Sequence, residues 1–318
     1  MLFSVAAAAV ALVLSPQQLA HHAHAPRISS RPVFMTAEAT AEPASMAQTI
    51  MRGPLEPNGS GGPLTKEQMV AVKAELEEIK QKYGLKEPVR GFMEGEDIEW
   101  RYGGPPDYSL TNLLFLKERT KAHPEGSLEL IVENLVKTWE MERSHKLDPN
   151  QHQSVDPATF TIAANGWKKF NNDEANEVGN YNVLMAGCPA KVWDMNSISW
   201  EQSHEKFHDT FAAFPWEVLE VFSPPPSVAF TWRHWGTFTG SYEGNKGNGE
   251  LVEMFGFGVA KVNDKLQLID VDIFYKPETF IQVLRGERKA DDLKNGQDIM
   301  GPAVAGGCPH FEALSKSK

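Results

Sequence analysis

The fold of this chain is decided near its C-terminal end, where four strand-like segments follow one another. They read WEVLEVF (216–222), VAFTWRHWGTFT (228–239), LVEMFGFGVAKV (251–262) and LQLIDVDIFY (266–275). Apolar and polar residues alternate in them, and β-branched and aromatic residues are frequent, which predicts half-buried strands. The turn-forming sequence SPPPS separates the first two segments, and Asn263-Asp264 separates the last two. Consecutive antiparallel strands are therefore expected.

The sequence before these strands has the spacing of helices. Ser127 precedes the run LELIVENLVKTWEMERSHK (128–146), in which apolar residues recur every three or four positions. Ser127 is therefore expected to cap an amphipathic helix. Further helices are predicted at 173–186 and 200–213. Helices followed by consecutive strands indicate an α+β domain, which we place at 96–286.

The flanking segments differ in composition from this domain. Residues 1–25 contain an apolar run of the length of a signal-peptide core, followed by an Ala-x-Ala sequence. Residues 26–64 begin with a basic, serine-bearing and acid-free stretch, typical of transit peptides, and continue as a linker rich in Pro and Gly. The apolar spacing at 65–84 predicts an amphipathic helix with Thr65 as its N-cap. Residues 287–318 form a polar tail.

The order of these N-terminal segments bears on location. A signal-like segment followed by a transit-like one resembles the two-part presequence of algae whose plastids lie inside additional membranes. A plastid location is therefore expected, with secretion as the alternative. The N-terminal apolar run is shorter than the ~20 residues needed to cross a bilayer, and no second run reaches that length. We therefore expect no membrane span in the mature chain.

Composition restricts the class of partner. The chain has 318 residues, 42 acidic and 31 basic side chains, and a formal net charge of -11. An acidic balance without a basic stripe argues against binding to nucleic acid, which requires clustered Lys and Arg. Only Cys188 and Cys308 occur, which excludes a disulfide framework or a cysteine-based zinc site. We expect no cofactor.

Several segments, taken in order, resemble the plant pathogen-related protein family. They are WRYGGPPDY (100–108), KERTKAHPEGSLE (117–129), VKTWEME (136–142), EVLEVFSPPP (217–226), TWRHWG (231–236), VEMFGFGVAKV (252–262), DIFY (272–275) and GCP (307–309). That family resembles the SnoaL-like polyketide cyclases of the nuclear-transport-factor-like, or cystatin-like, superfamily. The resemblance implies a curved antiparallel sheet wrapped round helices, which forms a cone with an internal pocket.

One departure limits what the resemblance implies about chemistry. SnoaL-type cyclases carry an acid-base Asp near the end of the last strand, and the corresponding place here falls near Phe274 or Tyr275. The aldol-cyclase reaction therefore cannot be assigned to this chain residue by residue.

The segment 230–236 is the first candidate site. Phe230, Trp232 and His234 point to one face of a strand. An imidazole among aromatic rings suits an apolar pocket with one proton-transfer group. The alternative is a core or interface strand whose histidine is hydrogen-bonded and inert.

Carboxylates on two other elements are further candidates. Asp272 either faces the cone as a base or points to solvent, in which case Tyr275 points inward with the apolar residues of that strand. Glu142 lies with Trp139 and His145 on the stripe of the 128–146 helix. It either forms a structural ion pair with His145 or Arg143 or is a base that faces a cavity.

These patterns lead to one main hypothesis and its alternatives. The protein is expected to act on a small hydrophobic molecule as a cofactor-independent isomerase, cyclase or lyase, with His234, Tyr275 and Glu142 as candidate catalytic residues. The candidate ligand-binding residues are Trp139, His145, Tyr181, Trp232, Phe257 and Asp272. The alternatives are a non-catalytic carrier or sensor in a stress or defence response, and a homodimeric scaffold associated through an exposed sheet face.

One segment matches a metal-binding pattern. His204-Glu205-Lys206-Phe207-His208 matches the H-E-x-x-H pattern of zinc peptidases. That pattern needs a third ligand, and none follows convincingly in the sequence. We expect this segment to be an exposed helix surface and no metal to be bound.

Overall fold

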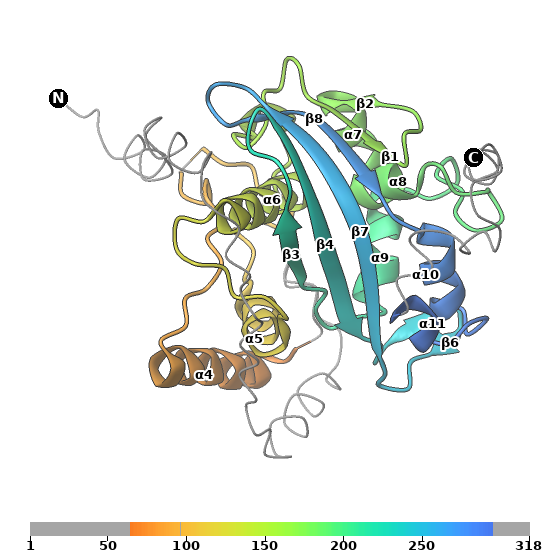
Figure 1. The fold of residues 1–318 in the computed structure, drawn as a ribbon. Coiled ribbons are helices and arrows are strands. Elements are labelled where there is room, and N and C mark those ends of the chain that lie inside the picture. The colour runs from red at the N-terminus through yellow and green to blue at the C-terminus, as the bar shows by residue number, and fades with distance from the viewer. Residues whose placement is uncertain (1–63, 96, 295–318) are drawn as a thin grey trace, which may run out of the picture.

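The computed structural model describes residues 64–95 and 97–294 (Figure 1). The predicted signal-like and transit-like segments, and most of the predicted tail, lie outside the described residues. Among those that are described, no helix combines the length and the apolar character needed to cross a bilayer.

A six-stranded sheet forms the centre of the molecule, in the order β2-β1-β8-β7-β4-β3. The four predicted strands are β3 (Trp216–Val221), β4 (Ser227–Thr237), β7 (Leu251–Val262) and β8 (Leu268–Phe274), and they pair antiparallel as expected. The sheet is strongly curved (Figure 1). The expected α+β class is confirmed.

The sheet is mixed rather than purely antiparallel, which corrects one expectation. The short strand β1 (Thr161–Ala164) pairs parallel to β8, and β2 (Phe170–Asn171) extends the sheet beyond it. Both are too short to show a period of two in the sequence, so alternation could not reveal them. The small hairpin of β5 (Ser241–Tyr242) and β6 (Asn245–Lys246) occupies the Gly-containing loop before β7.

Helices cover the concave side of the sheet. Figure 1 shows α8 and α9 behind the strands and α6 beside β3. The helical elements are α4 (Lys66–Tyr83), α5 (Ser109–Glu118), α6 (Leu128–His145), η2 (Pro149–Gln151), α7 (Asn172–Val178), α8 (Asn180–Met185), α9 (Trp200–His208), α10 (Pro277–Leu284) and α11 (Asp291–Lys294).

Two helix predictions need correction. The predicted helix 173–186 is divided into α7 and α8 at Gly179, whose φ of 92° lies in the left-handed region. A Cβ atom there would lie 2.6 Å from the Trp200 side chain, so the break also makes room for that ring. The predicted helix 200–213 ends earlier, at His208.

The predicted amphipathic helix is α4, and it packs on the rest of the molecule. The Thr65 side chain accepts a hydrogen bond from the Gln68 backbone, and Gly84 ends the helix with a φ of 63°. Val72 and Leu76 are buried in a cluster with α5 and Trp235. The polar face of α4 remains outside.

The side chains of strand β4 point alternately to the two faces of the sheet, and each face packs against a different hydrophobic cluster. Phe230 and Trp232 belong to the main core between the sheet and α6, α8 and α9. Trp235 lies on the opposite face, where its Nε1 donates to Glu118 at 2.7 Å. Arg233, on that same face, donates to Glu217 at 2.8 Å. The predicted division of the strand into two faces is confirmed.

The neighbouring strand β7 accommodates these rings by having no side chain opposite them. Gly256 pairs with Trp232 and Gly258 pairs with Phe230 across the sheet. A Cβ atom at Gly256 would lie 2.1 Å from the Trp232 ring, and one at Gly258 would lie 2.6 Å from the Phe230 ring. The two glycines therefore allow the aromatic rings to lie flat across β7 and form a wall.

We expect Gly256→Ala to destabilise the protein. The added methyl group must displace the buried Trp232 ring, and overpacking of this kind costs about 1–3 kcal/mol. The free energy of unfolding in urea measures the loss. Gly104→Ala is the matched control, since nothing lies within 4 Å of a Cβ atom there. Equal stability of the two variants would contradict this account of the wall.

Candidate functional site

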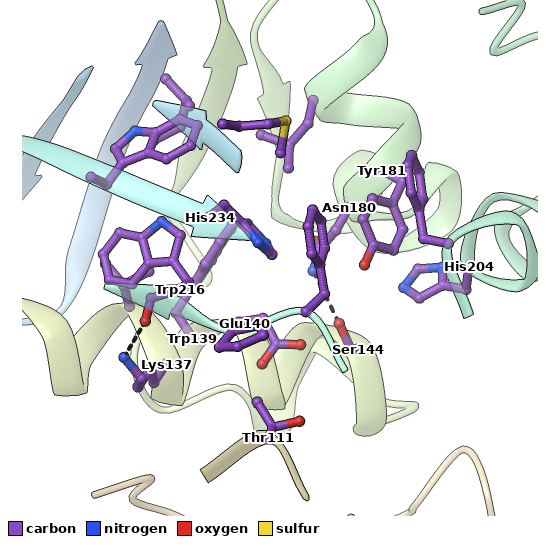
Figure 2. A pocket seen from close by; sticks show the side chains of 18 of the residues that line it. Thr111, Lys137, Trp139, Glu140, Ser144, Asn180, Tyr181, His204, Trp216 and His234 are labelled. Carbon is purple, nitrogen blue, oxygen red and sulfur yellow. Dashed lines mark hydrogen bonds between the residues drawn. The ribbon is translucent and has the colours of Figure 1, made fainter. Parts of the chain in front are cut away.

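A cavity of about 210 Å³ lies between the concave face of the sheet and the helices. Its apolar wall is made by inward-facing residues of three strands, namely Phe230, Trp232, Met254, Ala260, Leu268, Val271 and Ile273. The opposite wall comes from α6, α8 and α9 (Figure 2). Polar side chains on those helices face the apolar sheet across the cavity.

The structure brings six of the nine candidate site residues to this cavity. They are His234, Tyr275, Trp139, His145, Tyr181 and Trp232. They come from β4, the end of β8, α6 and α8, which are separated in the sequence by up to 136 positions. Glu142, Phe257 and Asp272 do not line the cavity.

Glu142 is a structural residue, which corrects its candidate catalytic role. Its carboxylate is fully buried and accepts hydrogen bonds from Lys146 Nζ at 2.7 Å and from the backbone of Gln153 at 2.9 Å and Ser154 at 2.8 Å. These contacts anchor the segment after α6. The ion-pair alternative therefore describes this residue, but its partner is Lys146 and not His145 or Arg143.

Phe257 and Asp272 lie on the outer face of the sheet, which corrects their candidate ligand-binding role. The Phe257 ring centroid lies 6.5 Å from that of Phe222 and 6.4 Å from that of Phe274. Asp272 accepts a hydrogen bond from the Gly166 backbone at 3.1 Å. Because side chains alternate along β8, Asp272 points outward when its apolar neighbours point inward.

Glu140 is the pocket carboxylate that sequence reasoning missed. It lies half a helical turn from Glu142 and lines the cavity. The Tyr108 hydroxyl donates to Glu140 Oε2 at 3.1 Å, and the Arg90 guanidinium lies 3.8 Å from the centre of the Tyr108 ring. The spacing Val136–Glu140–Ser144 on one side of α6 was the available signal.

Burial determines the protonation of Glu140. Removal from water raises the pKa of this carboxyl above its ordinary value. Arg90, Lys137 and hydrogen bonds from Tyr108 and Ser144 act in the opposite direction and stabilise the ionised form, but do not outweigh burial. The carboxyl is therefore a stronger base than one at the surface.

His234 is held as a neutral ring. It packs on Phe214 with ring centroids 3.6 Å apart. Burial, and then the charge of Lys137, lower the pKa of His234 to about 3, while the Pro215 carbonyl opposes this shift. Its Nδ1 atom is buried and has no hydrogen-bond partner among the described residues. His234 can therefore exchange a hydrogen bond with a ligand, but it carries no charge near neutral pH.

Two indole groups also present unused donors. Nε1 of Trp139 and Nε1 of Trp232 are buried and lack an acceptor in the described part of the chain. An indole N–H is a donor only, so a ligand oxygen would satisfy it. The Tyr275 hydroxyl is engaged, because it donates to the Leu184 carbonyl at 2.9 Å.

Lys137 borders the cavity, but its amine is already bound by other groups of the protein. Its Nζ donates to the Trp216 carbonyl at 2.6 Å, as Figure 2 shows, and lies 4.0 Å from the centre of the Phe115 ring. Burial lowers the pKa of Lys137 to about 7. These contacts direct the amine toward β3 and α5, so its main role is to hold α6 against the sheet.

The H-E-x-x-H segment is not the exposed surface expected from the sequence. His204 is only 4% exposed and lines the cavity together with His208. Within residues 64–95 and 97–294, no three His, Cys, Asp or Glu side chains are grouped so as to hold a metal ion. The two histidines therefore belong to the pocket wall.

Comparison with known proteins identifies the family. No family model matches the sequence. The chain is 36% identical over 220 residues to the "Pathogen-related protein" of Hordeum vulgare, covering 66% of this chain and 94% of that one. The present chain is therefore an α+β protein with an internal pocket, and it belongs to the pathogen-related protein family. The resemblance noted in the sequence is confirmed.

Solved structures show weaker similarity. A proposed SnoaL-like polyketide cyclase from Jannaschia sp. CCS1 is 12% identical, with a TM-score of 0.27 over 43% of this chain and 77% of that one. A protein of ketosteroid isomerase-like fold from Catenulispora acidiphila is 8% identical, with a TM-score of 0.29 over 49% of this chain and 95% of that one. At these scores, no ligand or reaction is transferred to this chain.

Three histidines that line the cavity predict how stability depends on pH. Burial lowers the pKa values of His145, His204 and His234 to about 3, below the ordinary value of 6.5. Between these values the unfolded chain binds protons that the folded chain does not, so stability increases with pH over this window. Each such histidine contributes up to about 1.4 kcal/mol per pH unit.

Urea unfolding at pH 5 and pH 7 tests this prediction. The difference in unfolding free energy between the two pH values is expected to be smaller in His234→Gln than in the wild type, because one buried neutral ring is absent. An unchanged difference would show that His234 is not held neutral by burial.

Proposed function

We propose that the protein binds a small, mainly apolar organic molecule in this cavity and transfers a proton on it, with Glu140 as the base. The observation that carries the proposal is a carboxyl with a raised pKa facing the same enclosed space as unpartnered indole and imidazole nitrogens. Such groups are expected where a protein carries out acid-base chemistry. The proton-transfer role expected of His234 is thereby replaced by a neutral His234 that orients the ligand.

The size and lining of the cavity support a compact ligand. An engineered protein cavity of about 150 Å³ accommodates benzene, so a 210 Å³ space suits a molecule on the order of ten non-hydrogen atoms. Aromatic and aliphatic residues of β4, β7 and β8 would contact its apolar part. The helical wall would contact its polar atoms.

The proposed reaction is removal of a proton from a carbon next to a carbonyl group. The Glu140 carboxylate accepts the proton, and the electron pair of the C–H bond moves to form the enolate, whose oxygen gains the negative charge. A donor such as Trp139 or Trp232 Nε1 would stabilise that oxygen. Return of the proton from Glu140 to another carbon gives an isomer without a cofactor.

Tyr108, Ser144 and Arg90 would position the base. The Tyr108 hydroxyl donates to one carboxylate oxygen, Oε2, and Ser144 also hydrogen-bonds to the carboxyl group, so the two restrict its rotation. Arg90 donates to Asn112 at 2.7 Å and stacks on Tyr108, so it supports the tyrosine. A base held in this way needs little rearrangement during the reaction.

One observation favours the second candidate function, a carrier. His145, His204 and His234 are all held neutral, and the Tyr275 hydroxyl is bound to the backbone. A pocket that only stores a neutral molecule needs no charged group. The two functions differ in whether Glu140 affects a reaction or only binding. The name of the Hordeum vulgare relative supports a role in defence for either function.

We expect the wild type to accelerate the ring-opening elimination of 5-nitrobenzisoxazole, a compact probe of base catalysis. Glu140 would remove the C3 proton as the N–O bond breaks, and the coloured phenolate is followed by absorbance. Glu140→Gln should lower the rate about 100-fold or more, within the range for loss of a general base. The wild-type rate should rise with pH as Glu140 ionises, at pH values above the ordinary carboxyl range.

Glu205→Gln is the matched control, because Glu205 is exposed on α9. It should leave the elimination unchanged. If Glu140→Gln eliminated the probe as fast as the wild type, Glu140 would not be the base. If the probe bound to the wild type without reacting, the carrier function would replace the enzymatic one.

We also propose delivery to a plastid, on the basis of the signal-like and transit-like composition of residues 1–64. Fusion of these residues to a fluorescent protein in an alga with a secondary plastid should send fluorescence into that organelle. A fusion of residues 26–64 without the signal-like part should remain outside it. Fluorescence of the full fusion in the medium would favour the secreted alternative.

A further inference from the structure

His204 is held rigidly in the wall of the cavity. It lies in the middle of α9 and its ring stacks on Trp200, with centroids 3.7 Å apart and an interplanar angle of 11°. The Tyr181 ring of α8 lies in a T-shaped arrangement with it, at a centroid distance of 4.8 Å. Figure 2 shows His204 beside Tyr181 at one end of the cavity.

The backbone of α9 determines which nitrogen of His204 carries the proton. Nδ1 lies 3.0 Å from the Trp200 carbonyl oxygen. Ser203 Oγ lies 3.3 Å from the same Nδ1, but its hydroxyl donates to the Trp200 carbonyl at 2.7 Å. Both neighbours of Nδ1 therefore act as acceptors, and Nδ1 carries the proton. Burial, together with the nearby His208, His145 and Arg101, lowers the pKa of His204 to about 3. The ring is therefore neutral, and Nε2 carries a lone pair.

This lone pair accepts no hydrogen bond from the described part of the protein. Nε2 of His204 is buried and has no hydrogen-bond partner among residues 64–95 and 97–294. A buried acceptor without a donor is unfavourable, because it has lost its hydrogen bond to water. A carbonyl, ether or carboxylate oxygen of a ligand would place a second lone pair against it. An O–H or N–H donor, which a hydroxyl-bearing ligand supplies, satisfies this atom.

We propose that His204 Nε2 is a recognition subsite for a hydroxyl group, so that the pocket prefers neutral phenols and alcohols over the corresponding ethers and hydrocarbons. The inference rests on the ligand-binding part of the proposed function and not on the Glu140 step. His204 is thus a specificity-determining residue.

The test compares three molecules of similar shape. Binding of 2-naphthol, 2-methoxynaphthalene and naphthalene to the full chain is measured by isothermal titration calorimetry at pH 7.5. Wild type should bind 2-naphthol about ten-fold more tightly than the other two, the effect of one buried hydrogen bond. His204→Phe keeps a ring on Trp200 but removes the acceptor, and should reduce the preference to within about two-fold.

Glu205→Gln, on the adjacent exposed position of α9, is the matched control and should keep the wild-type preference. Equal affinity of the wild type for all three molecules would overturn the proposed subsite but not the proposed binding of apolar molecules in the cavity. Binding of none of them would overturn the subsite together with the proposed ligand-binding function.

A second measurement does not depend on a variant. In wild type labelled with ¹⁵N-histidine, the His204 Nε2 resonance should move when 2-naphthol is added, because the hydroxyl donates to it. 2-Methoxynaphthalene should not produce that change. An Nε2 resonance that responds equally to both compounds, or to neither, would overturn the proposal even if His204→Phe does not fold.

Discussion

The arrangement of the pocket depends on which face of β4 each residue occupies. A buried ion pair on the outer face of the sheet fixes the register of β4, and therefore which residues face inward. Arg233 contacts Glu217 of β3 at 2.8 Å and Glu253 of β7 at 2.6 Å, so one guanidinium joins three adjacent strands. Glu217 also accepts from the backbone of Thr120 and Lys121. Displacement of β4 by one residue would turn Arg233 into the apolar interior, which is prohibitively unfavourable without its partners.

With the register of β4 fixed in this way, the aromatic rings of Phe230 and Trp232 and the imidazole of His234 lie on its inner face. The rings need space on the next strand, and Gly256 and Gly258 of β7 provide it. The resulting wall is apolar, whereas the wall contributed by α6, α8 and α9 carries Glu140 and His204. The cavity therefore combines a low-dielectric interior with a few fixed polar atoms. That combination shifts the pKa of Glu140 upward and those of the histidines downward, since burial disfavours the charged form of both.

Sequence reasoning succeeded where a local pattern and the tertiary contact agree. The bounds of β7, the two faces of β4 and the capped helix α4 follow from period two, period 3.6 and the chemistry of Thr65. It failed where the pattern was too short or too ambiguous. Strand β1 has four residues and α5 has an apolar composition on all sides, so neither shows a period.

The candidate site shows the same division. His234 and Trp232 could be assigned to one interior because alternation along a strand leaves only two faces. On α6 a choice between Glu140 and Glu142 could not be made from spacing, since both sides of that helix are buried in the folded protein. Glu142 forms an ion pair with Lys146 and accepts hydrogen bonds from the backbone at 153–154, whereas Glu140 lines the cavity.

The amino-acid sequence by itself determined the α+β class, the family, the inward face of β4 and the aromatic character of the pocket, because these depend on residue types and on repeats of two or of three to four residues. Tertiary structure alone decided that His204 is buried, that β1 lies parallel to β8, and which carboxylate faces the cavity. Those features depend on contacts between segments far apart in the chain, and the environment created by such contacts sets both the burial and the protonation of each group.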